Sequence, residues 1–412
     1  MNFLNSLDKW IRSLRRQFHR EPELSFNEHR TQKEIMYVLE DLGIACKKIA
    51  GTGVIAEIHG NGPGPCMAIR SDMDALAVVE RATGFNEDYI SRNPGVMHAC
   101  GHDGHMAIVL GAARLLQEQR DSFGGSVRLI FQPAEEVPPG GAVRVIGDGG
   151  LEGVDAIVGL HIFGDVDVGA INIRAGPFMA GSVRFTVKIF GKGGHHSTPG
   201  DCIDPIAIAA DFISSLNTRV SEKVDPSDYA LGFGTVNSGE QFNRTPDEVE
   251  IVGSFRTFNA EDTEAIKDSM SSLLDYLVTA YSHKDRRGVP SYELKVQYGY
   301  PVLFNDPVFT KKATRLLKTR FSNVNDDARA IFGAEDFAYY LQEVPGMYVI
   351  LGTRNVEKGI VEGNHSSGFD IDEDVLITGV ELLYSVTLDF LNVPRAYVRS
   401  EHLLNEHHTF FI

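Results

Sequence analysis

The sequence predicts an α/β fold in which a mainly parallel sheet, covered by helices, forms the main domain and a smaller ferredoxin-like α+β domain is inserted into it. Three observations predict this fold class. The chain has 412 residues, which is long for one core and comfortable for two domains. Its first third alternates apolar strands with helices, which is typical of a parallel sheet with covered faces. Its middle alternates polar and apolar residues, which is typical of a sheet with one face in water.

The first elements are two amphipathic helices. Apolar residues recur at helical spacing from Leu4 to Phe18, and a second helix places Ile35 and Leu39 on one face and ends at Gly43. A long helix is expected to begin near His105. The strands expected around it are VIAEIHG from Val54, CMAIRSD from Cys66, SVRLIFQ from Ser126 and DAIVGLH from Asp155.

The middle of the chain predicts the inserted domain. Ser182 to Phe190 alternates strictly, and a helix is expected to begin at Pro205 with Asp204 as its N-cap. Two strands, a helix and a last strand follow, and the order β-α-β-β-α-β is typical of a ferredoxin-like unit. Because the chain then returns to helix–strand alternation, we expect two crossings between the domains and a mobile lid. The predicted boundaries are 1–180 plus 295–412 for the main domain and 181–294 for the insertion.

Charge and composition exclude several classes of protein. The formal net charge is −17, from 56 acidic and 39 basic side chains, which argues against binding to nucleic acid or to anionic membranes. The N-terminal segment lacks a basic region followed by an apolar core, so we do not expect it to be a signal peptide, and no apolar run approaches the length that spans a bilayer. The four cysteines lack a disulfide-framework spacing, so we expect reduced thiols in a cytoplasmic protein. The expected partner is a small-molecule substrate. The tail from Leu391 is interpreted as a surface extension without an assigned role.

The segment MHACGHDGH, from Met97 to His105, predicts a metal site. A single histidine is more often a core or surface residue, but three histidines, a cysteine and an aspartate within nine residues favour a metal. Imidazole and thiolate together suit Zn²⁺ and similar transition ions better than Mg²⁺ or Ca²⁺. Gly101 and Gly104 would let the backbone turn, so that the neighbouring side chains converge.

Further candidates follow the predicted strands. Asp72 and Asp74 come after CMAIR, the pair Glu135-Glu136 comes after SVRLIFQ, and His161 closes DAIVGL. Sites in open α/β sheets assemble outside the carboxyl ends of the strands, so these residues are expected to meet the cysteine–histidine turn. An isolated Glu-Glu pair is usually a solvated acidic pair. At a strand end, however, one carboxylate can ligate a metal while its neighbour takes a proton from the water that the metal activates.

Together these residues carry a family resemblance. The segments RRQFHREPELSFNE, IRSDMDAL, MHACGHDGH, IFQPAEE, GLHI, GKGGH, GAEDFAYYLQEVPG and NHSSGFD occur in this order between about residues 12 and 390. This arrangement resembles the M20 metallopeptidase family, and specifically its amidohydrolase branch, which includes hippurate hydrolases, N-acyl-amino-acid amidohydrolases and auxin-conjugate hydrolases.

The resemblance implies a centre of two divalent transition-metal ions, Zn²⁺, Mn²⁺ or Co²⁺. Cys100 would lie between the ions as a thiolate, Glu135 would be the general base, and Asp74 would orient a ligand. The implied metal ligands are Cys100, His102, Glu136, His161 and His365.

The resemblance also assigns residues of the inserted domain. His195 matches a histidine that, in family dimers, reaches the partner subunit's site and polarises the scissile carbonyl, which implies a homodimer formed through the inserted domain. Asn243 and Arg256 match positions that hold substrate, and an arginine suits a bidentate grip on a free carboxylate. A salt bridge on the domain surface is an equally good interpretation of Arg256 from the sequence alone.

Several residues depart from the family pattern, and these departures leave the substrate open. They are Ala77, His196, Ser197, Gly200, Arg244 and Thr245. The expected reaction is hydrolysis of an N-acyl or N-aroyl amino acid by metal-activated water. An alternative is hydrolytic deamination of a small aromatic amine at the same centre. A non-catalytic subunit would be expected to lose ligands, and here the implied set is complete.

Overall fold

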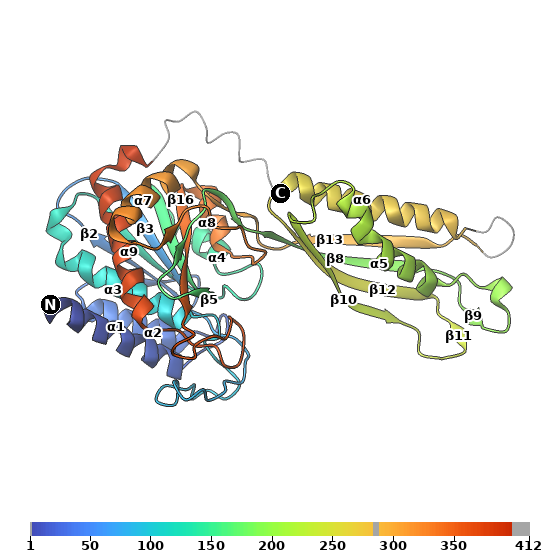
Figure 1. Ribbon diagram of the computed structural model, residues 1–412, viewed down its shortest axis with the longest axis horizontal. Coiled ribbons are helices and arrows are strands. Elements are labelled where there is room, and N and C mark those ends of the chain that lie inside the picture. The colour runs from blue at the N-terminus through green and yellow to red at the C-terminus, as the bar shows by residue number, and fades with distance from the viewer. Residues whose placement is uncertain (1, 283–287, 398–412) are drawn as a thin grey trace. The chain divides into compact units, whose positions relative to one another are not determined.

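The computed structural model describes residues 2–282 and 288–397 (Figure 1). These residues form two compact units. The first comprises residues 2–178, 303–329 and 335–397, and the second comprises the described residues of 179–302 together with 330–334. The sequence analysis ended the insertion at residue 294, whereas the second unit includes the whole of strand β13, Ser291–Tyr298.

The first unit is built on an eight-stranded, mainly parallel sheet, as predicted. The central strands β4, β3, β5 and β16 are neighbours in this order and run parallel. The strand VIAEIHG is antiparallel to both of its neighbours, because a short turn joins it to the strand before it and forces the chain to reverse. In spatial order the strands are β1 (Cys46–Ile49), β2 (Gly53–His59), β4 (Ser126–Gln132), β3 (Cys66–Asp72), β5 (Ala156–Asp167), β16 (Gly346–Arg354), β6 (Ile171–Asn172) and β15 (Val324–Asn325).

Helices cover both faces of this sheet. Helices α1 (Asn2–Arg20), α3 (His102–Glu118) and α9 (Asp374–Asn392) pack together on one face and form the main core with it (Figure 1). In β16, Val349 belongs to this core, whereas its neighbour Tyr348 packs on Phe337 of α8 (Phe337–Glu343), as the two-residue period of a strand requires. The remaining elements of this unit are α2 (His29–Asp41), α4 (Ala142–Gly147), α7 (Pro307–Arg320) and the paired strands β7 (Gly176–Met179) and β14 (Leu303–Asn305).

The start of the C-terminal tail is part of the core, so its interpretation as a surface extension was wrong for these residues. Leu391 and Tyr397 are buried, and the Tyr397 ring packs on Phe309 and Phe390. The prediction failed because Pro394 and Arg395 end the helical pattern without ending the packing. The rest of the tail, including His407 and His408, lies outside the described residues.

The second unit has one four-stranded antiparallel sheet with two helices packed on one of its faces. Its sheet order, β10-β12-β8-β13, is the ferredoxin-like connectivity. Along β8, Val183 and Phe185 are buried while Arg184 is exposed, which confirms the predicted alternation. Asp204 caps α5 by accepting a hydrogen bond from the Ile206 N–H. In chain order the elements are β8 (Gly181–Phe190), β9 (Gly194–His195), α5 (Pro205–Ser221), β10 (Tyr229–Ser238), β11 (Arg244–Thr245), β12 (Glu248–Thr257), α6 (Ala260–Ala280) and β13.

Two expectations from composition can be compared with the fold. All four cysteines, Cys46, Cys66, Cys100 and Cys202, are free thiols. Among the described residues, no helix combines the length and the apolar character that crossing a membrane requires.

Candidate metal centre

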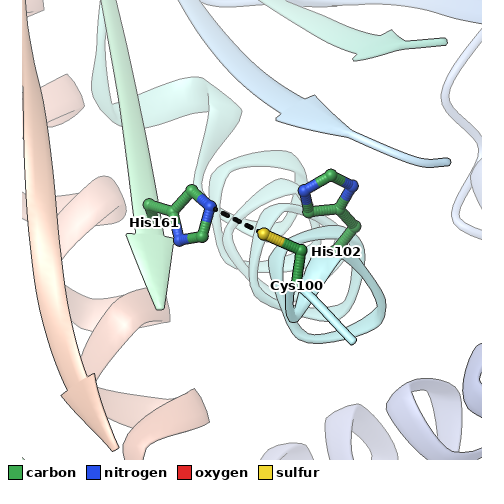
Figure 2. Close-up of side chains that lie close together, drawn as sticks. All are labelled: Cys100, His102 and His161. Carbon is green, nitrogen blue, oxygen red and sulfur yellow. Dashed lines mark hydrogen bonds between the residues drawn. The ribbon is translucent and has the colours of Figure 1, made fainter. Parts of the chain in front are cut away.

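Five of the predicted site residues gather at the carboxyl end of β3. Cys100, His102 and His161 offer ligand atoms that all lie within 4.8 Å of one another, and Figure 2 shows the His161 ring on β5 pointing at the Cys100 sulfur. A second group with the same spacing consists of Cys100, Glu136 and His365. The two groups share Cys100, so the arrangement has two candidate cation positions with the cysteine between them.

His161 does not close its strand, as the sequence analysis expected. Strand β5 continues to Asp167, because β16 pairs with it well beyond that point. Its other neighbour, β3, pairs only as far as Gly159. His161 therefore lies where β5 extends past the end of β3, and the space beyond β3 is where the candidate ligands meet.

The turn that carries Cys100 and His102 depends on Gly101. This glycine has φ +85°, a left-handed conformation that costs a residue with a side chain more, and it forms the N-cap of α3. Gly104 does not make a turn, contrary to the prediction. It lies in the first turn of α3, where an added Cβ would come within 2.7 Å of the Ile162 side chain, so its role is to let the helix approach β5.

Backbone carbonyls fix the tautomers of two of the histidines. The Nδ1 atom of His102 lies 2.8 Å from the carbonyl oxygen of Asp74, and Nδ1 of His161 lies 2.9 Å from that of Ile162. Because a carbonyl oxygen only accepts, each Nδ1 must carry a proton, and in the neutral ring Nε2 then has a free lone pair. Nε2 of His161 lies 3.4 Å from the Cys100 sulfur, and the buried Nε2 of His102 has no hydrogen-bond partner among the described residues.

His365 reaches the centre from a loop of the last third of the chain. Its Nε2 lies 3.2 Å from the Cys100 sulfur and 3.5 Å from Oε1 of Glu136. Its backbone adopts φ +69°, which is uncommon for a residue other than glycine. The His365 N–H donates to the Ala99 carbonyl at 2.7 Å, and this contact holds the strained loop against the segment before Cys100.

Asp74 holds the turn of the two glutamates. Its carboxylate accepts the backbone N–H of Glu135 at 3.0 Å and that of Glu136 at 3.1 Å, and it also accepts the Ser25 hydroxyl at 2.7 Å. Because the backbone carbonyl of Asp74 also accepts a hydrogen bond from Nδ1 of His102, Asp74 contacts both the glutamate turn and a candidate ligand. Glu135 and Glu136 in turn offer oxygen atoms within 4.8 Å of a nitrogen of His102.

The electrostatics of these residues fit a cation. Burial, followed by the nearby Glu136, raises the pKa of the Cys100 thiol well above its usual value, so a thiolate here calls for positive charge beside it. Burial lowers the pKa of His102, but Asp72 and Asp74 outweigh it and raise that pKa to about 10. The buried Oε1 of Glu136, like Nε2 of His102, has no hydrogen-bond partner among the described residues. A soft anionic sulfur, imidazole nitrogens and a carboxylate form a donor set that suits transition ions.

Of the three histidines in the MHACGHDGH segment, only His102 presents a nitrogen to the centre. His105 lies near Asp72 and His102, but its Nδ1 is 2.7 Å from an Asp72 oxygen and its Nε2 accepts the Ile162 N–H at 2.9 Å. Both of its nitrogens are therefore engaged, and it holds β5 to β3. His98 is buried, and neither of its nitrogens has a hydrogen-bond partner in the described part of the chain.

The sequence analysis assigned no role to a buried ionic cluster next to Glu135. Arg70 of β3 lies 3.0 Å from a Glu335 oxygen and 2.8 Å from an Asp336 oxygen, and oxygens of Glu135, Glu335 and Asp336 lie within 4.8 Å of one another. Burial, and then the charge of Glu335, raise the pKa of Glu135 well above its usual value. An arginine inside a fully buried strand was the signal in the sequence, because such a charge requires acidic partners.

The three predicted site residues of the second unit differ in how far they are exposed. His195 and Asn243 are exposed, on β9 and next to β11. Arg256 of β12 is half-buried, and burial lowers the pKa of its guanidinium. No carboxylate in the described part of the chain lies within ion-pair distance of Arg256, and its one hydrogen bond goes to the Phe255 carbonyl. The surface salt bridge considered from the sequence is therefore wrong.

Comparison with known proteins places this chain in a family. Residues 68–389 match the model of peptidase family M20/M25/M40. The chain belongs to that family. The resemblance inferred from the motifs is thereby confirmed, and this M20 protein is a metal-dependent hydrolase of C–N bonds.

Individual relatives cover nearly the whole chain. Thermostable carboxypeptidase 2 of Saccharolobus solfataricus is 37% identical over 95% of this chain and 98% of its own length. N-acetyl-L-cysteine deacetylase of Bacillus subtilis is 40% identical over 92% and 88%, respectively. The crystal structure of a dinuclear metal-binding M20 peptidase of B. subtilis superposes with a TM-score of 0.82 at 34% identity, and covers 94% of this chain and 99% of that one. The M20 hydrolases therefore include proteins whose metal centre is dinuclear, as the two ligand groups here suggest.

Proposed function

We propose that this hydrolase cleaves the amide bond of an N-acyl or N-aroyl amino acid, with Glu135 as the general base. The observation that carries the proposal is the position of Glu135. Its carboxylate lies within 4.8 Å of both His102 and Glu136, in a buried position next to the two ligand groups. The proposed ligands are Cys100, His102, Glu136, His161 and His365, around two ions of Zn²⁺, Mn²⁺ or Co²⁺.

The residues of the chain have separate tasks in this mechanism. When bound, the two cations would lower the pKa of the attacking water and stabilise negative charge on the amide oxygen. Glu135 takes a proton from the water as its oxygen adds to the amide carbon. The same carboxyl then donates that proton to the leaving nitrogen as the C–N bond breaks.

Arg256 supports a substrate with a free carboxylate. A half-buried guanidinium without an acidic partner loses hydration and gains no ion pair within its own unit. A substrate carboxylate would supply the missing partner in a bidentate contact. The names of the relatives agree with this class, since N-acetyl-L-cysteine deacetylase and carboxypeptidase both denote substrates with an amino-acid carboxylate.

We also propose a cytoplasmic homodimer in which the inserted domain serves as lid and dimerisation domain. This rests on the resemblance, in which the histidine matching His195 acts on the site of the partner subunit. In the proposal His195 polarises the scissile carbonyl and Asn243 assists in holding the substrate. Deamination of a small aromatic amine is the less favoured reaction, because only some aromatic amines carry a carboxylate for Arg256, whereas every N-acyl amino acid has one.

Paired glutamate variants test the proposal. Glu135→Gln should retain both metal ions and lower kcat by roughly 10²–10⁴, because the base is lost while the ligands stay. Glu136→Gln is the matched control and should lose metal instead. Mass spectrometry measures the metal content of each variant. Turnover is measured with N-acetyl and N-benzoyl amino acids, and separately with aromatic amines, for which the readout is the release of ammonia. Near-normal turnover in Glu135→Gln, or turnover of the amines alone, would overturn the proposal.

A further inference from the structure

The ring of His195 is held by the residue two positions further along the chain. The backbone N–H of Ser197 donates to Nδ1 of His195 at 3.1 Å, and the Ser197 hydroxyl oxygen lies 2.8 Å from the same nitrogen. A turn creates this contact, because the Thr198 N–H donates to the His195 carbonyl at 2.9 Å and so folds Ser197 back onto the ring. On its other side, His195 pairs with Arg244 in the β9–β11 ladder.

These contacts decide which nitrogen of His195 carries the proton. A backbone N–H only donates, so Nδ1 must present its lone pair, and the neutral ring must then hold its proton on Nε2. The hydroxyl of Ser197 strengthens this choice, because it can also donate to Nδ1. This is the opposite tautomer from that of His102 and His161, whose Nδ1 atoms donate to carbonyl oxygens.

We propose that Ser197 is a positioning residue that keeps His195 in the Nε2–H tautomer, so that Nε2 donates a hydrogen bond to the substrate carbonyl oxygen. This inference rests on the proposed function, in which His195 polarises that carbonyl. A donor aimed at an oxygen that gains negative charge stabilises the transition state more than the ground state. The other tautomer would point a lone pair at the same oxygen and repel it.

The chemistry explains why a serine is useful at position 197. A residue without a hydroxyl would leave only the 3.1 Å backbone contact to set the tautomer. The ring is exposed, so water would compete for Nδ1 and the second tautomer would become more populated. The serine hydroxyl replaces that water with a donor held by the turn.

The first test is spectroscopic and does not depend on activity. In the metal-loaded protein labelled with ¹⁵N-histidine, the His195 signals are identified as those missing from His195→Gln. The nitrogen shifts should show an unprotonated Nδ1 and a protonated Nε2 in the wild type. They should move toward a mixture of tautomers in Ser197→Ala and return in Ser197→Thr, which restores the hydroxyl. A protonated Nδ1 in the wild type, or shifts unchanged in Ser197→Ala, would overturn the proposal.

The second test asks whether the tautomer matters for the reaction. Ser197→Ala should lower kcat about 2- to 10-fold, the change that one neutral hydrogen bond is worth, with KM and metal content unchanged. The side-chain amide of Gln can reach the place of Nε2, whereas that of Asn reaches only the place of Nδ1. His195→Asn should therefore lose about 10²–10³ in kcat, as when a transition-state donor is removed, and His195→Gln should lose less.

The outcomes separate this inference from the proposed function. Equal losses in His195→Asn and His195→Gln, or unchanged kcat in Ser197→Ala, overturn the role of the tautomer while the Glu135→Gln result still stands. Normal turnover in Glu135→Gln overturns the hydrolytic mechanism, and the nitrogen shifts of His195 still report the tautomer.

Discussion

Hydrogen bonds to the nitrogens that face away from the metal centre prepare its histidines. Nδ1 of His102 and of His161 is engaged by the Asp74 and Ile162 carbonyls, so Nε2 is the atom that each ring has left to bind a cation. Metal binding then does not have to select a tautomer, and its free energy is not spent on reorienting rings. The same reasoning excludes His105, whose nitrogens are both engaged.

A buried histidine outside the metal centre, His19, makes the stability of the folded protein depend on pH. His19 lies 2.7 Å from an Asp103 oxygen and 3.0 Å from a Glu80 oxygen. Burial and Arg15 disfavour its charge, yet Asp103 and Glu80 outweigh them and raise its pKa to about 9. Since this folded-state value lies above the unfolded value of about 6.5, the charged histidine stabilises the protein fully below about pH 6.5, and the contribution is lost as pH rises through about 9.

His19→Gln should therefore lower the thermal midpoint most at acidic pH. The lost contribution is on the order of 3 kcal/mol at pH 6 and approaches zero above pH about 9. Thermal unfolding of both proteins across this range, followed by circular dichroism, measures the difference. A midpoint difference that stays constant with pH would show that His19 is not charged in the folded protein.

The residues that form the site could be predicted from the sequence, but the hydrogen bonds and ion pairs that hold them in place could not. Cys100, His102 and Glu136 stood out because cysteine, histidine and adjacent acids rarely cluster near strand ends without a use. Two of the acidic partners of Arg70, Glu335 and Asp336, lie more than 200 residues away along the chain, and no local pattern links them to it. The lone pair on Nδ1 of His195 depends on a turn geometry that is visible only in the folded chain.

Between elements, the packing of α3 on α9 determines where the start of α3 lies. At Gly111 an added Cβ would come within 2.6 Å of the Val380 side chain and 2.9 Å of the Ile11 side chain. Gly379 meets Ile108 in the same way at 2.6 Å, so two glycines let these helices approach closely. Helix α3 carries His102 in its first turn, and its position therefore bears on the metal centre.

Gly111→Ala should destabilise the protein by about 1–3 kcal/mol, the usual cost of overpacking a core. Gly147→Ala is the matched control, because an added Cβ at the end of α4 meets nothing within 4 Å. That control should be neutral or stabilising by about 0.4–1 kcal/mol. Chemical denaturation gives both values, and equal stability of the two variants would contradict the close packing of α3 on α9.

Most elements could be predicted because their patterns are local. The alternation along Ser182–Phe190 and the Asp204–Pro205 helix start both appear in the structure. What failed was set by partners distant in sequence. β5 runs past His161 because β16 pairs there, and Tyr397 is buried because Phe309 and Phe390 lie beside it.

At the scale of the whole molecule, the proposed residues are divided between two units. The candidate ligands and Glu135 belong to the first unit, and His195, Asn243 and Arg256 belong to the second. The fold class of both units and the connectivity of the second unit could be predicted from periodicity, because each unit has its own core. The predicted homodimer would bring a histidine of one subunit to the centre of its partner.

Complementation tests that shared site. His195→Ala and Glu135→Gln proteins are each expected to be nearly inactive. Random exchange makes half of the dimers mixed, and each mixed dimer has one intact site, so the mixture should recover roughly one quarter of wild-type activity. The measurement is turnover after the two proteins are mixed. Mass spectrometry of the dimers verifies that subunits have exchanged. No recovery despite complete exchange would rule out a site built from two subunits.

The most direct test of the account is the location of the metal ions in crystals of the protein reconstituted with Mn²⁺ or Zn²⁺, determined by anomalous scattering. The account predicts two ions on either side of the Cys100 sulfur, each at coordination distance, about 2.3 Å for Zn²⁺. His102 and His161 should bind one ion, and Glu136 and His365 the other. A single ion, or ions bound away from Cys100, would contradict it.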